Sequence, residues 1–283
     1  MSHYFVGRAD ASWPTHPARC RRFDYGSVMQ SVKDFYRELA QGRLALAFQP
    51  VVWLPDASRV LYQEGLLRHV EQPGKGVYPF AMLERHQVMR ELDRSVVGCV
   101  IERLLKDEHL RLGCNISAQS AIVDPFWSAT LAQLRDAPSV AARLVIEITE
   151  SATPPSPEAA IEFVLCLREL GCRVAVDDFG AGLGTLEFIR QTRPDMVKID
   201  QGYLQRARSE PNSVQTLKHL VQLCKTLAPC VIIEGIESEA DRALATACGG
   251  EWGQGYLFGR PRLDRLGAPC RLRGVVAEPV VAG

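Results

Sequence analysis

Short apolar runs of strand length alternate along this chain with segments whose apolar residues recur at helical spacing. An apolar run of about four to eight residues bounded by turn signals is typical of a buried strand. Apolar residues three and four positions apart predict the covered face of a helix. The predicted strands are residues 44–52, 59–70, 112–117, 144–150, 173–178, 195–200, 230–234 and 254–258, and helical patterns occur at residues 28–39, 79–107, 157–167, 213–227 and 238–248.

Strands that alternate with helices over most of a chain favour an α/β fold, and eight such strands favour a TIM-type (β/α)8 barrel. We predict that residues 41–264 form this barrel as a single domain. Residues 1–40 read as a short N-terminal extension whose helix either covers the bottom of the barrel or links it to a regulatory partner. Residues 265–283 read as a peripheral tail.

Local signals mark several element boundaries. Residues 55–58 contain Pro, Asp and Ser and predict the turn between the first two strands. Ser156, followed by Pro157, predicts the start of one helix, and Ser238 predicts the start of another.

Composition and charge exclude several classes of protein. Apolar residues make up 47% of the chain, enough for a large core, and the 33 basic residues equal the 33 acidic residues. This balance gives no reason to expect binding to DNA or to a membrane surface. No apolar run approaches the roughly 18 residues of a membrane span, and the first residues lack the apolar core of a signal peptide. We therefore expect no membrane span.

The cysteines and histidines do not form a metal-binding pattern. The nine cysteines are scattered without a Cys-x-x-Cys pair, and the six histidines are equally dispersed. An odd and unclustered set of cysteines is typical of reduced, buried thiols. We therefore expect a cytoplasmic protein with no disulfide framework and no zinc site.

Polar residues follow the apolar part of successive predicted strands, at the ends that meet at one mouth of a parallel barrel. Any one of them could be a structural hydrogen-bonding residue, but their recurrence at the corresponding point of each repeat favours a shared site. They are Glu64, Asn115, Glu147, Asp177, Asp178, Lys198, Glu234 and Gln254.

The chemistry of this set points to metal ions. Carboxylates that converge at one barrel mouth repel one another unless cations lie among them. Oxygen ligands without His or Cys select hard ions, so Mg²⁺ or Mn²⁺ is expected rather than Zn²⁺. Two such ions about 4 Å apart suit phosphodiester cleavage, in which Lys198 would orient the water or stabilise developing charge.

Seven motifs occur in order along these strands, and together they resemble the EAL-domain family of cyclic di-GMP phosphodiesterases. The resemblance covers residues 42–262 and implies a modified TIM-type barrel that hydrolyses cyclic di-GMP to linear pGpG with two Mg²⁺ or Mn²⁺ ions. The motifs are Glu64-Gly65-Leu66-Leu67-Arg68, Cys114-Asn115-Ile116-Ser117, Glu147-Ile148-Thr149-Glu150, Asp177-Asp178-Phe179-Gly180, Lys198-Ile199-Asp200, Glu234-Gly235-Ile236-Glu237 and Gln254-Gly255-Tyr256.

The resemblance also implies roles for individual residues. It implies that Asp177 bridges one ion to a second ion near Asp178, that Lys198 and Glu234 act on the attacking water, and that Glu150 anchors the loop after the fifth strand. It further implies a homodimer through that loop. The implied ligands of the first ion are Glu64, Asn115, Glu147 and Asp177, and the implied nucleotide contacts are Gln49, Arg68, Asp93 and Gln254.

Two departures from the family pattern bear on activity. Gly65 replaces the usual Ala beside Glu64, which keeps the carboxylate but loosens the backbone next to it. Residues 181–185 have lost most of the usual hydroxyl-bearing residues and include Gly184, which predicts a more mobile loop and activity that is lower or dependent on a regulatory protein partner.

Other functions compete with hydrolysis. A cyclic di-GMP receptor or interaction module of the same fold would fit a barrel that had lost metal ligands, but every implied ligand is present. An enolase-like barrel would use carboxylate-held Mg²⁺ and a Lys base, which the Asp177-Asp178 pair and Asn115 fit poorly. A kinase built on Asp178-Phe179-Gly180 lacks the other kinase motifs.

Overall fold

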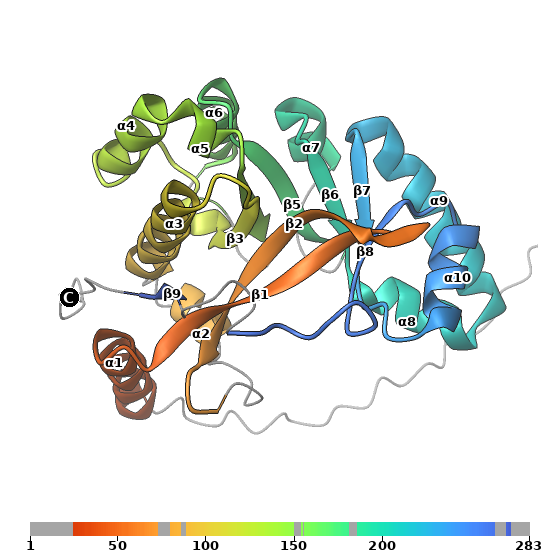
Figure 1. Ribbon diagram of the computed structural model, residues 1–283, viewed down its shortest axis with the longest axis horizontal. Coiled ribbons are helices and arrows are strands. Elements are labelled where there is room, and N and C mark those ends of the chain that lie inside the picture. Colours follow the sequence, from red (N-terminus) through yellow and green to blue (C-terminus); the bar gives the residue numbers. More distant parts are fainter. Residues whose placement is uncertain are drawn as a thin grey trace, which may run out of the picture.

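A closed barrel of parallel and antiparallel strands forms the body of the molecule (Figure 1). The computed structural model describes residues 25–72, 80–85, 89–149, 154, 156–180, 186–263 and 270–272. The sheet runs in the order β2-β3-β4-β5-β6-β7-β8-β1, and β1 also pairs with β2, which closes the barrel. The strands are β1 (Leu44–Trp53), β2 (Asp56–His69), β3 (Leu112–Ser117), β4 (Leu144–Thr149), β5 (Arg173–Phe179), β6 (Met196–Ile199), β7 (Cys230–Ile233), β8 (Trp252–Gln254) and β9 (Cys270–Arg271).

Strand β1 runs antiparallel to both of its barrel neighbours, β2 and β8, whereas β2 to β8 are parallel. The predicted modified TIM-type barrel is thus confirmed, and the modification is this one reversed strand. Because β1 and β2 form a hairpin, no helix is needed between them. The antiparallel register places Gln49 of β1 opposite Glu64 of β2.

Two predicted strands have bounds that differ from the structure by more than one residue, and the predicted tail contains an unpredicted strand. The turn expected at residues 55–58 is shorter, because β2 already begins at Asp56, whose carboxylate accepts hydrogen bonds from the backbone and side chain of Ser58. The strand expected at residues 254–258 is instead β8, which ends at Gln254. The next residue, Gly255, packs so closely against the segment after β7 that a side-chain carbon there would lie 2.0 Å from the carbonyl oxygen of Ile236. The tail includes the short strand β9, which pairs with β1.

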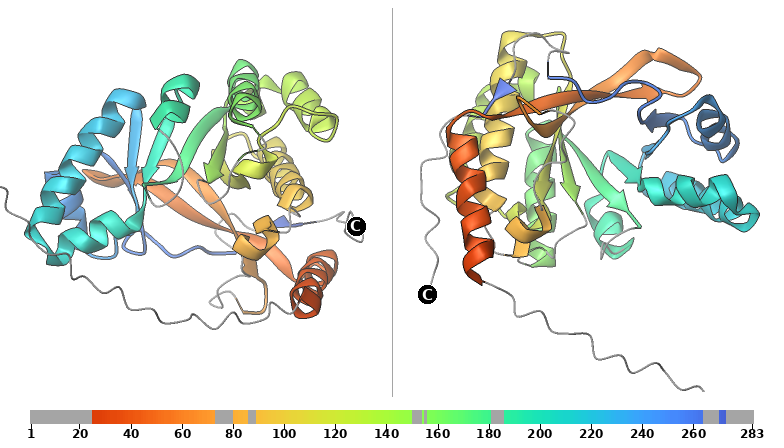
Figure 2. Two further views of the ribbon diagram at one scale, coloured as in Figure 1. Left: turned by 180° about the vertical axis from the view of Figure 1, so that it is seen from behind. Right: turned by 90° about the horizontal axis from the view of Figure 1, so that it is seen from below.

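Helices cover the outside of the barrel on several sides (Figure 2). The helical patterns at residues 28–39, 157–167, 213–227 and 238–248 are confirmed within one turn, whereas α4, α5, α7 and α8 were not predicted because they are short or weakly periodic. The helices are α1 (Tyr25–Ala40), α2 (Phe80–Arg85), α3 (Met89–Lys106), α4 (Ser128–Asp136), α5 (Pro138–Ala141), α6 (Pro157–Glu169), α7 (Leu186–Thr192), α8 (Gln201–Ser209), α9 (Pro211–Leu227) and α10 (Glu239–Ala247), with a 3-10 turn at Ala118–Ser120.

Both predicted helix caps are present. The Ser156 hydroxyl accepts a hydrogen bond from the backbone N–H of Ala159 at 3.0 Å. Ser238 and Asp241 form a reciprocal capping box at the start of α10. These caps fix the residues at which α6 and α10 begin. Helix α10 follows β7, and the predicted site residue Glu234 lies directly after that strand.

The N-terminal helix packs on the barrel. Val32, Phe35 and Leu39 of α1 are buried in one apolar cluster with Leu44 and Leu46 of β1. Of the two roles expected for this helix, the contacts support covering the barrel. Among the described residues, no helix combines the length and apolar character needed to cross a membrane.

The barrel interior is layered. Its apolar layer consists of residues two positions before a polar site residue along the parallel strands and, on the reversed strand β1, of Val51, which lies two positions after Gln49. Since side chains two apart on a strand share a face, this layer forms the base on which the polar layer rests. The apolar residues are Val51, Tyr62, Val145, Ala175, Met196 and Ile232.

The cysteines correct one expectation. Cys99 is disulfide-bonded, so the prediction that all thiols are reduced is wrong at this position. The sequence spacing of cysteines does not report which of them lie within bonding distance in the fold. The cytoplasmic location, which was inferred from reduced thiols, remains a prediction. The free cysteines among the described residues are Cys114, Cys166, Cys172, Cys224, Cys230 and Cys248.

Candidate functional site

The predicted site residues that the structure describes gather at one mouth of the barrel, most of them at the carboxyl ends of the parallel strands. They border a pocket of about 560 Å³, a volume typical of small-molecule sites. Glu147 and Lys198 are almost fully buried and lie below the pocket surface. The pocket lining includes Gln49, Glu64, Arg68, Asp93, Asn115, Asp177, Asp178, Glu234 and Gln254.

Lys198 lies at the centre of the acidic residues. Its ammonium nitrogen is 3.1 Å from Glu64, 2.8 Å from Glu147, 2.9 Å from Asp177 and 2.9 Å from Glu234. Its side chain is only 1% exposed. One buried positive charge therefore faces four carboxylates, which leaves an excess of negative charge in a dry environment.

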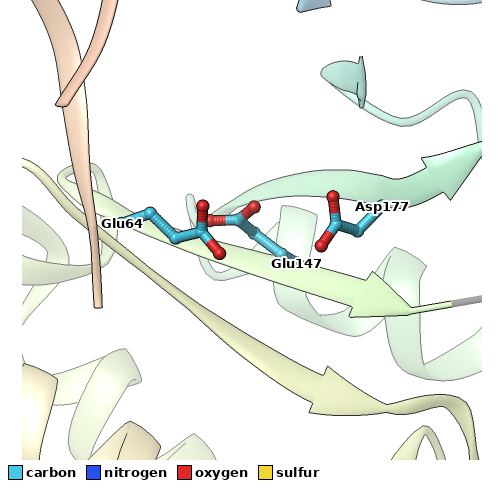
Figure 3. Close-up of side chains that lie close together, drawn as sticks. All are labelled: Glu64, Glu147 and Asp177. Atoms are coloured by element: carbon cyan, nitrogen blue, oxygen red, sulfur yellow. The ribbon is translucent and has the colours of Figure 1, made fainter. Parts of the chain in front are cut away.

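Two groups of carboxylates are arranged so that each could hold a cation. Ligand oxygens of Glu64, Glu147 and Asp177 lie within 4.8 Å of one another, as do those of Asp177, Asp178 and Glu234. Figure 3 shows the carboxylates of Glu64 and Glu147 next to each other, with Asp177 facing them from β5. Because Asp177 belongs to both groups, two adjacent ions would share it.

Unpartnered buried acceptors support this arrangement. Asn115 donates from its amide nitrogen to Glu64 at 2.6 Å, and this orients its Oδ1, which has no hydrogen-bond partner among the described atoms. The Oε1 atom of Glu147 is likewise buried without a partner there. Glu147 Oε2 and Asp177 Oδ1 lie 2.8 and 2.9 Å from the Lys198 nitrogen, close enough for ion pairs. The angles at these contacts are not those of hydrogen bonds. Buried oxygen acceptors without donors fit Mg²⁺ or Mn²⁺.

The pKa values reflect the crowding of charge. Burial raises the pKa of Glu234 to about 8, with Lys198 opposing the shift. Burial and then the neighbouring Asp177 raise the pKa of Asp178 to about 6. Burial and then Glu64 raise the pKa of Glu147 well above its usual range. Burial alone would lower the pKa of Lys198, but the carboxylates around it raise it well above its usual value. Lys198 thus stays charged while the carboxylates compete for cations.

The backbone at the end of β5 explains how two adjacent aspartates reach one site. Neighbouring side chains on a regular strand point to opposite faces. Asp178 adopts a left-handed conformation with φ of 55°, and the pairing of β5 with β6 shifts register between Val176 and Phe179. This irregularity turns both carboxylates toward the site. A left-handed non-glycine residue is strained, and such residues cluster at functional sites.

The four predicted nucleotide contacts all line the pocket but differ in the hydrogen bonds that they already make within the protein. Gln254 donates to Glu64 at 2.6 Å, and Gln49, which lies opposite Glu64 in the β1–β2 register, donates to the carbonyl of Gly259 at 2.9 Å, so both lie beside Glu64. Arg68 lines the pocket. Asp93 also lines it, but its carboxylate already accepts from the Ser117 backbone at 3.0 Å.

Some predicted features fall outside the described residues, and some pocket residues were missed. Glu150 and residues 181–185 lie outside the described part of the chain. Glu84 and Tyr256 line the pocket without having been predicted. Glu84 is buried and accepts from the Ser117 hydroxyl at 2.9 Å, a contact between α2 and β3 that no sequence spacing reveals. Tyr256 is stacked with Arg260 at 4.0 Å and belongs to the last motif.

Two glycines control the packing around Glu64 and Glu147. A side-chain carbon on Gly113 would lie 2.6 Å from the Glu147 carboxylate and 2.6 Å from the Tyr62 ring, so Tyr62 fills the space that a larger residue at 113 would need. A carbon on Gly65 would meet the Gly113 carbonyl and the Phe48 ring, each at 3.2 Å. Gly65 lies within β2 and pairs with residues of both β1 and β3. The close contacts around it leave little room for the side chain of the usual Ala.

Replacing Gly113 with alanine should displace Glu147. We expect Gly113→Ala to lower the free energy of unfolding by about 1–3 kcal/mol, as overpacking of a core does, and to weaken Mn²⁺ binding. The matched control is Gly98→Ala in α3, where an added carbon meets nothing within 4 Å. This control should raise stability by about 0.5–1 kcal/mol because alanine favours helix. Urea unfolding and Mn²⁺ titration of both variants check this. Equal effects of the two substitutions would contradict it.

The fold and site together define a class of protein, namely a modified TIM barrel whose strand ends gather carboxylates able to hold divalent cations. The chain belongs to the EAL domain family: the model of the EAL domain matches residues 32–261. The family resemblance inferred from the motifs is thereby confirmed.

Two curated relatives are named as cyclic di-GMP phosphodiesterases. RocR of Pseudomonas aeruginosa is 29% identical over 244 residues, which are 82% of this chain and 61% of that protein. PdeR of Escherichia coli is 28% identical over 233 residues, which are 80% of this chain and 35% of that protein. The chain thus spans less than two thirds of the length of these relatives.

Solved structures agree with the fold. The PaMucR phosphodiesterase in complex with c-di-GMP has a TM-score of 0.69 and 25% identity, and the match covers 82% of this chain and 97% of that one. An EAL domain protein from Listeria monocytogenes EGD-e has a TM-score of 0.69 at 21% identity, covering 82% of this chain and 93% of that one. The second likeness shows the fold alone.

Proposed function

We propose that this chain is a metal-dependent phosphodiesterase that hydrolyses cyclic di-GMP to linear pGpG. The observation that carries the proposal is the pair of carboxylate groups that share Asp177 at the pocket floor. The names of RocR and PdeR support the substrate, since both are cyclic di-GMP phosphodiesterases.

Two hard cations, Mg²⁺ or Mn²⁺, fit the oxygen ligands of this chain. Glu64, Asn115, Glu147 and Asp177 would hold the first ion, and Asp177 with Asp178 would hold the second. When bound, such ions lower the pKa of a coordinated water and neutralise phosphate charge.

The remaining residues would act on the water and the nucleotide. Glu234 lies 2.9 Å from Lys198 and belongs to the second carboxylate group, so its carboxylate would be placed to accept a proton from the attacking water. Lys198 would supply a fixed positive charge beside the reacting phosphate. We assign Gln49, Arg68, Asp93 and Gln254 to holding the nucleotide in the pocket they line.

The proposed quaternary organisation depends on the loop after β5. We propose a homodimer formed through this loop, whose anchor would be Glu150, and a regulatory protein partner that acts on it. Residues 181–185 and Glu150 lie outside the described residues, so the support for this assembly is the sequence resemblance.

Incubation of the purified protein with cyclic di-GMP tests the proposed function. With Mg²⁺ or Mn²⁺ the wild type should release pGpG, resolved by chromatography, and a chelator should abolish the reaction. Glu64→Ala should lower turnover by at least about 100-fold, because it removes a buried ligand and an electrostatic partner of Lys198. Glu64→Gln keeps the side-chain volume, so a similar loss in this variant separates metal binding from packing.

Each other outcome identifies a different function. Tight nucleotide binding without product would overturn hydrolysis and favour a receptor. Neither binding nor turnover would favour a barrel used for protein contacts.

A further inference from the structure

The segment after β7 delivers Glu234 to the site and Glu237 to the pocket wall. Toward the barrel, the backbone N–H of Ile236 donates to the Gln254 carbonyl at 3.1 Å, and the Ile236 carbonyl accepts from Leu257 at 3.1 Å. These bonds fix the middle of the segment, and the backbone N–H of Glu234 donates to the Ile199 carbonyl at 3.2 Å, which fixes its start but leaves the Gly235 carbonyl to be held from the outer side. Gly235, directly after Glu234, adopts a left-handed φ of 75°.

Arg208 of α8 holds the outer side of this segment. Its guanidinium donates to the Gly235 carbonyl at 2.8 Å and to both carboxylate oxygens of Asp241 in α10, at 2.7 and 3.0 Å. Such a two-pronged pair fixes direction as well as distance. Glu237 lies 3.5 Å from the same guanidinium. Figure 1 shows α8 and α10 next to each other at one edge of the barrel.

Asp241 connects this pair to the rest of the segment. Its carboxylate also accepts from the backbone N–H groups of Glu237 at 3.0 Å and Ser238 at 2.9 Å. Arg208 and Asp241 therefore contact the backbone at Gly235, Glu237 and Ser238, immediately after Glu234. Neither side chain belongs to the lining of the pocket.

The turn at Gly235 has little room to adjust. A side-chain carbon at this position would lie 2.6 Å from Cβ of Gln201, so the segment is pressed against the start of α8. Arg208 belongs to the same helix. A rotation about the backbone torsions of Gly235 would turn Glu234 relative to the rest of the segment, because one peptide bond joins the two residues and the Gly235 carbonyl lies on the other side of these torsions. The hydrogen bond from Arg208 opposes this rotation.

We propose that Arg208, held by Asp241, is a positioning residue that fixes the orientation of Glu234. The inference rests on the proposed function, in which Glu234 accepts the proton of the attacking water. Small displacements of a catalytic group caused by remote contacts can lower rates by up to about 100-fold. Glu234 also belongs to the second carboxylate group, so its orientation affects cation binding as well.

Arg242 provides a matched control on the neighbouring position of α10. Its guanidinium donates to the Leu54 carbonyl at 2.7 Å and the Pro55 carbonyl at 3.2 Å, which join α10 to the β1–β2 hairpin. Its side chain is 26% exposed, close to the 33% of Arg208. Loss of either arginine removes contacts between α10 and a neighbouring element, but Arg208 alone of the two pairs with the buried Asp241 and contacts the segment after Glu234.

The experiment compares Arg208→Ala, Arg208→Lys and Arg242→Ala in the full chain. We expect Arg208→Ala to lower kcat for cyclic di-GMP by about tenfold with KM changed less than about threefold. We expect it also to weaken Mn²⁺ binding measured by electron paramagnetic resonance. Arg208→Lys should recover part of the loss, because lysine keeps the charge but cannot make the two-pronged pair. Arg242→Ala should change the melting temperature but neither kcat nor Mn²⁺ affinity.

The inference is overturned if Arg208→Ala and Arg242→Ala have the same kcat and Mn²⁺ affinity. If Arg208→Ala does not fold, Arg208→Lys decides, since unchanged kcat and Mn²⁺ affinity in that variant would equally overturn it. If the wild type itself does not hydrolyse cyclic di-GMP, the proposed function fails, but Mn²⁺ affinity still tests the role of Arg208. The two failures are therefore distinguishable.

Discussion

Replacing Lys198 with methionine is expected to lower the free energy of unfolding of the metal-free protein by about 3–5 kcal/mol, the usual cost of removing one partner from a buried ion pair. The reason is that Lys198 is the cation that four carboxylates contact, three of them buried and the fourth partly buried. Methionine keeps the length and apolar stem of lysine but leaves those carboxylates without a counter-charge. The same variant should lower turnover of cyclic di-GMP by at least about 100-fold.

Urea unfolding with a chelator and with excess Mn²⁺ measures this effect. Mn²⁺ should stabilise Lys198→Met more than the wild type, because the ions then supply the missing positive charge. Lys225→Met is the control, since Lys225 pairs with Glu251 on the exposed surface and such pairs contribute at most about 1 kcal/mol. Equal stability of Lys198→Met and wild type without metal would refute the central role of Lys198.

Substituting Glu234 with glutamine is expected to lower kcat by roughly 10²–10⁴-fold, the usual contribution of a general base. Glutamine has nearly the same volume and can still meet Lys198, but it cannot accept a proton. Stability should change little in comparison, since the Glu234 side chain is 17% exposed and lies at the edge of the buried carboxylates. Steady-state kinetics at saturating Mn²⁺, together with the melting temperature, separate the two effects.

The control for this variant is Glu239→Gln, which alters an exposed carboxylate in the first turn of α10. It should leave kcat and KM unchanged. A decrease of less than about threefold for Glu234→Gln would assign the proton transfer to another group.

The barrel was predictable because its pattern is local. Each strand of a parallel barrel is a short apolar run, and each covering helix has a periodic apolar face, so both can be read without knowing their neighbours. The bounds of β3, at Leu112–Ser117, match the expected strand, and Ser156 and Ser238 begin helices as predicted. Helix α5 was missed because four residues are too few for a period to be recognised, and α8 was missed because it buries only Leu204 and Ala207.

The site was predictable as a set of residues but not as an arrangement. The polar positions recur at the strand ends, so their meeting at one mouth follows from the fold class. Which of them contact Lys198, and that Asp177 belongs to two groups, depends on the closed barrel. Glu84 reached the pocket from α2 without any sequence signal.

The sequence by itself determined the alternation of strands and helices, the polar residues at strand ends and the oxygen-rich chemistry that selects hard cations. These properties are local, since they depend on side-chain type and spacing. The tertiary structure alone decided the reversed direction of β1, the left-handed backbone at Asp178, the packing of Tyr62 beside Gly113 and the contact of Arg208 with the segment after Glu234. Each of these joins residues that are distant along the chain or bends the backbone away from a regular strand. These features depend on contacts that exist only in the closed barrel, where side chains from different strands and helices pack against one another.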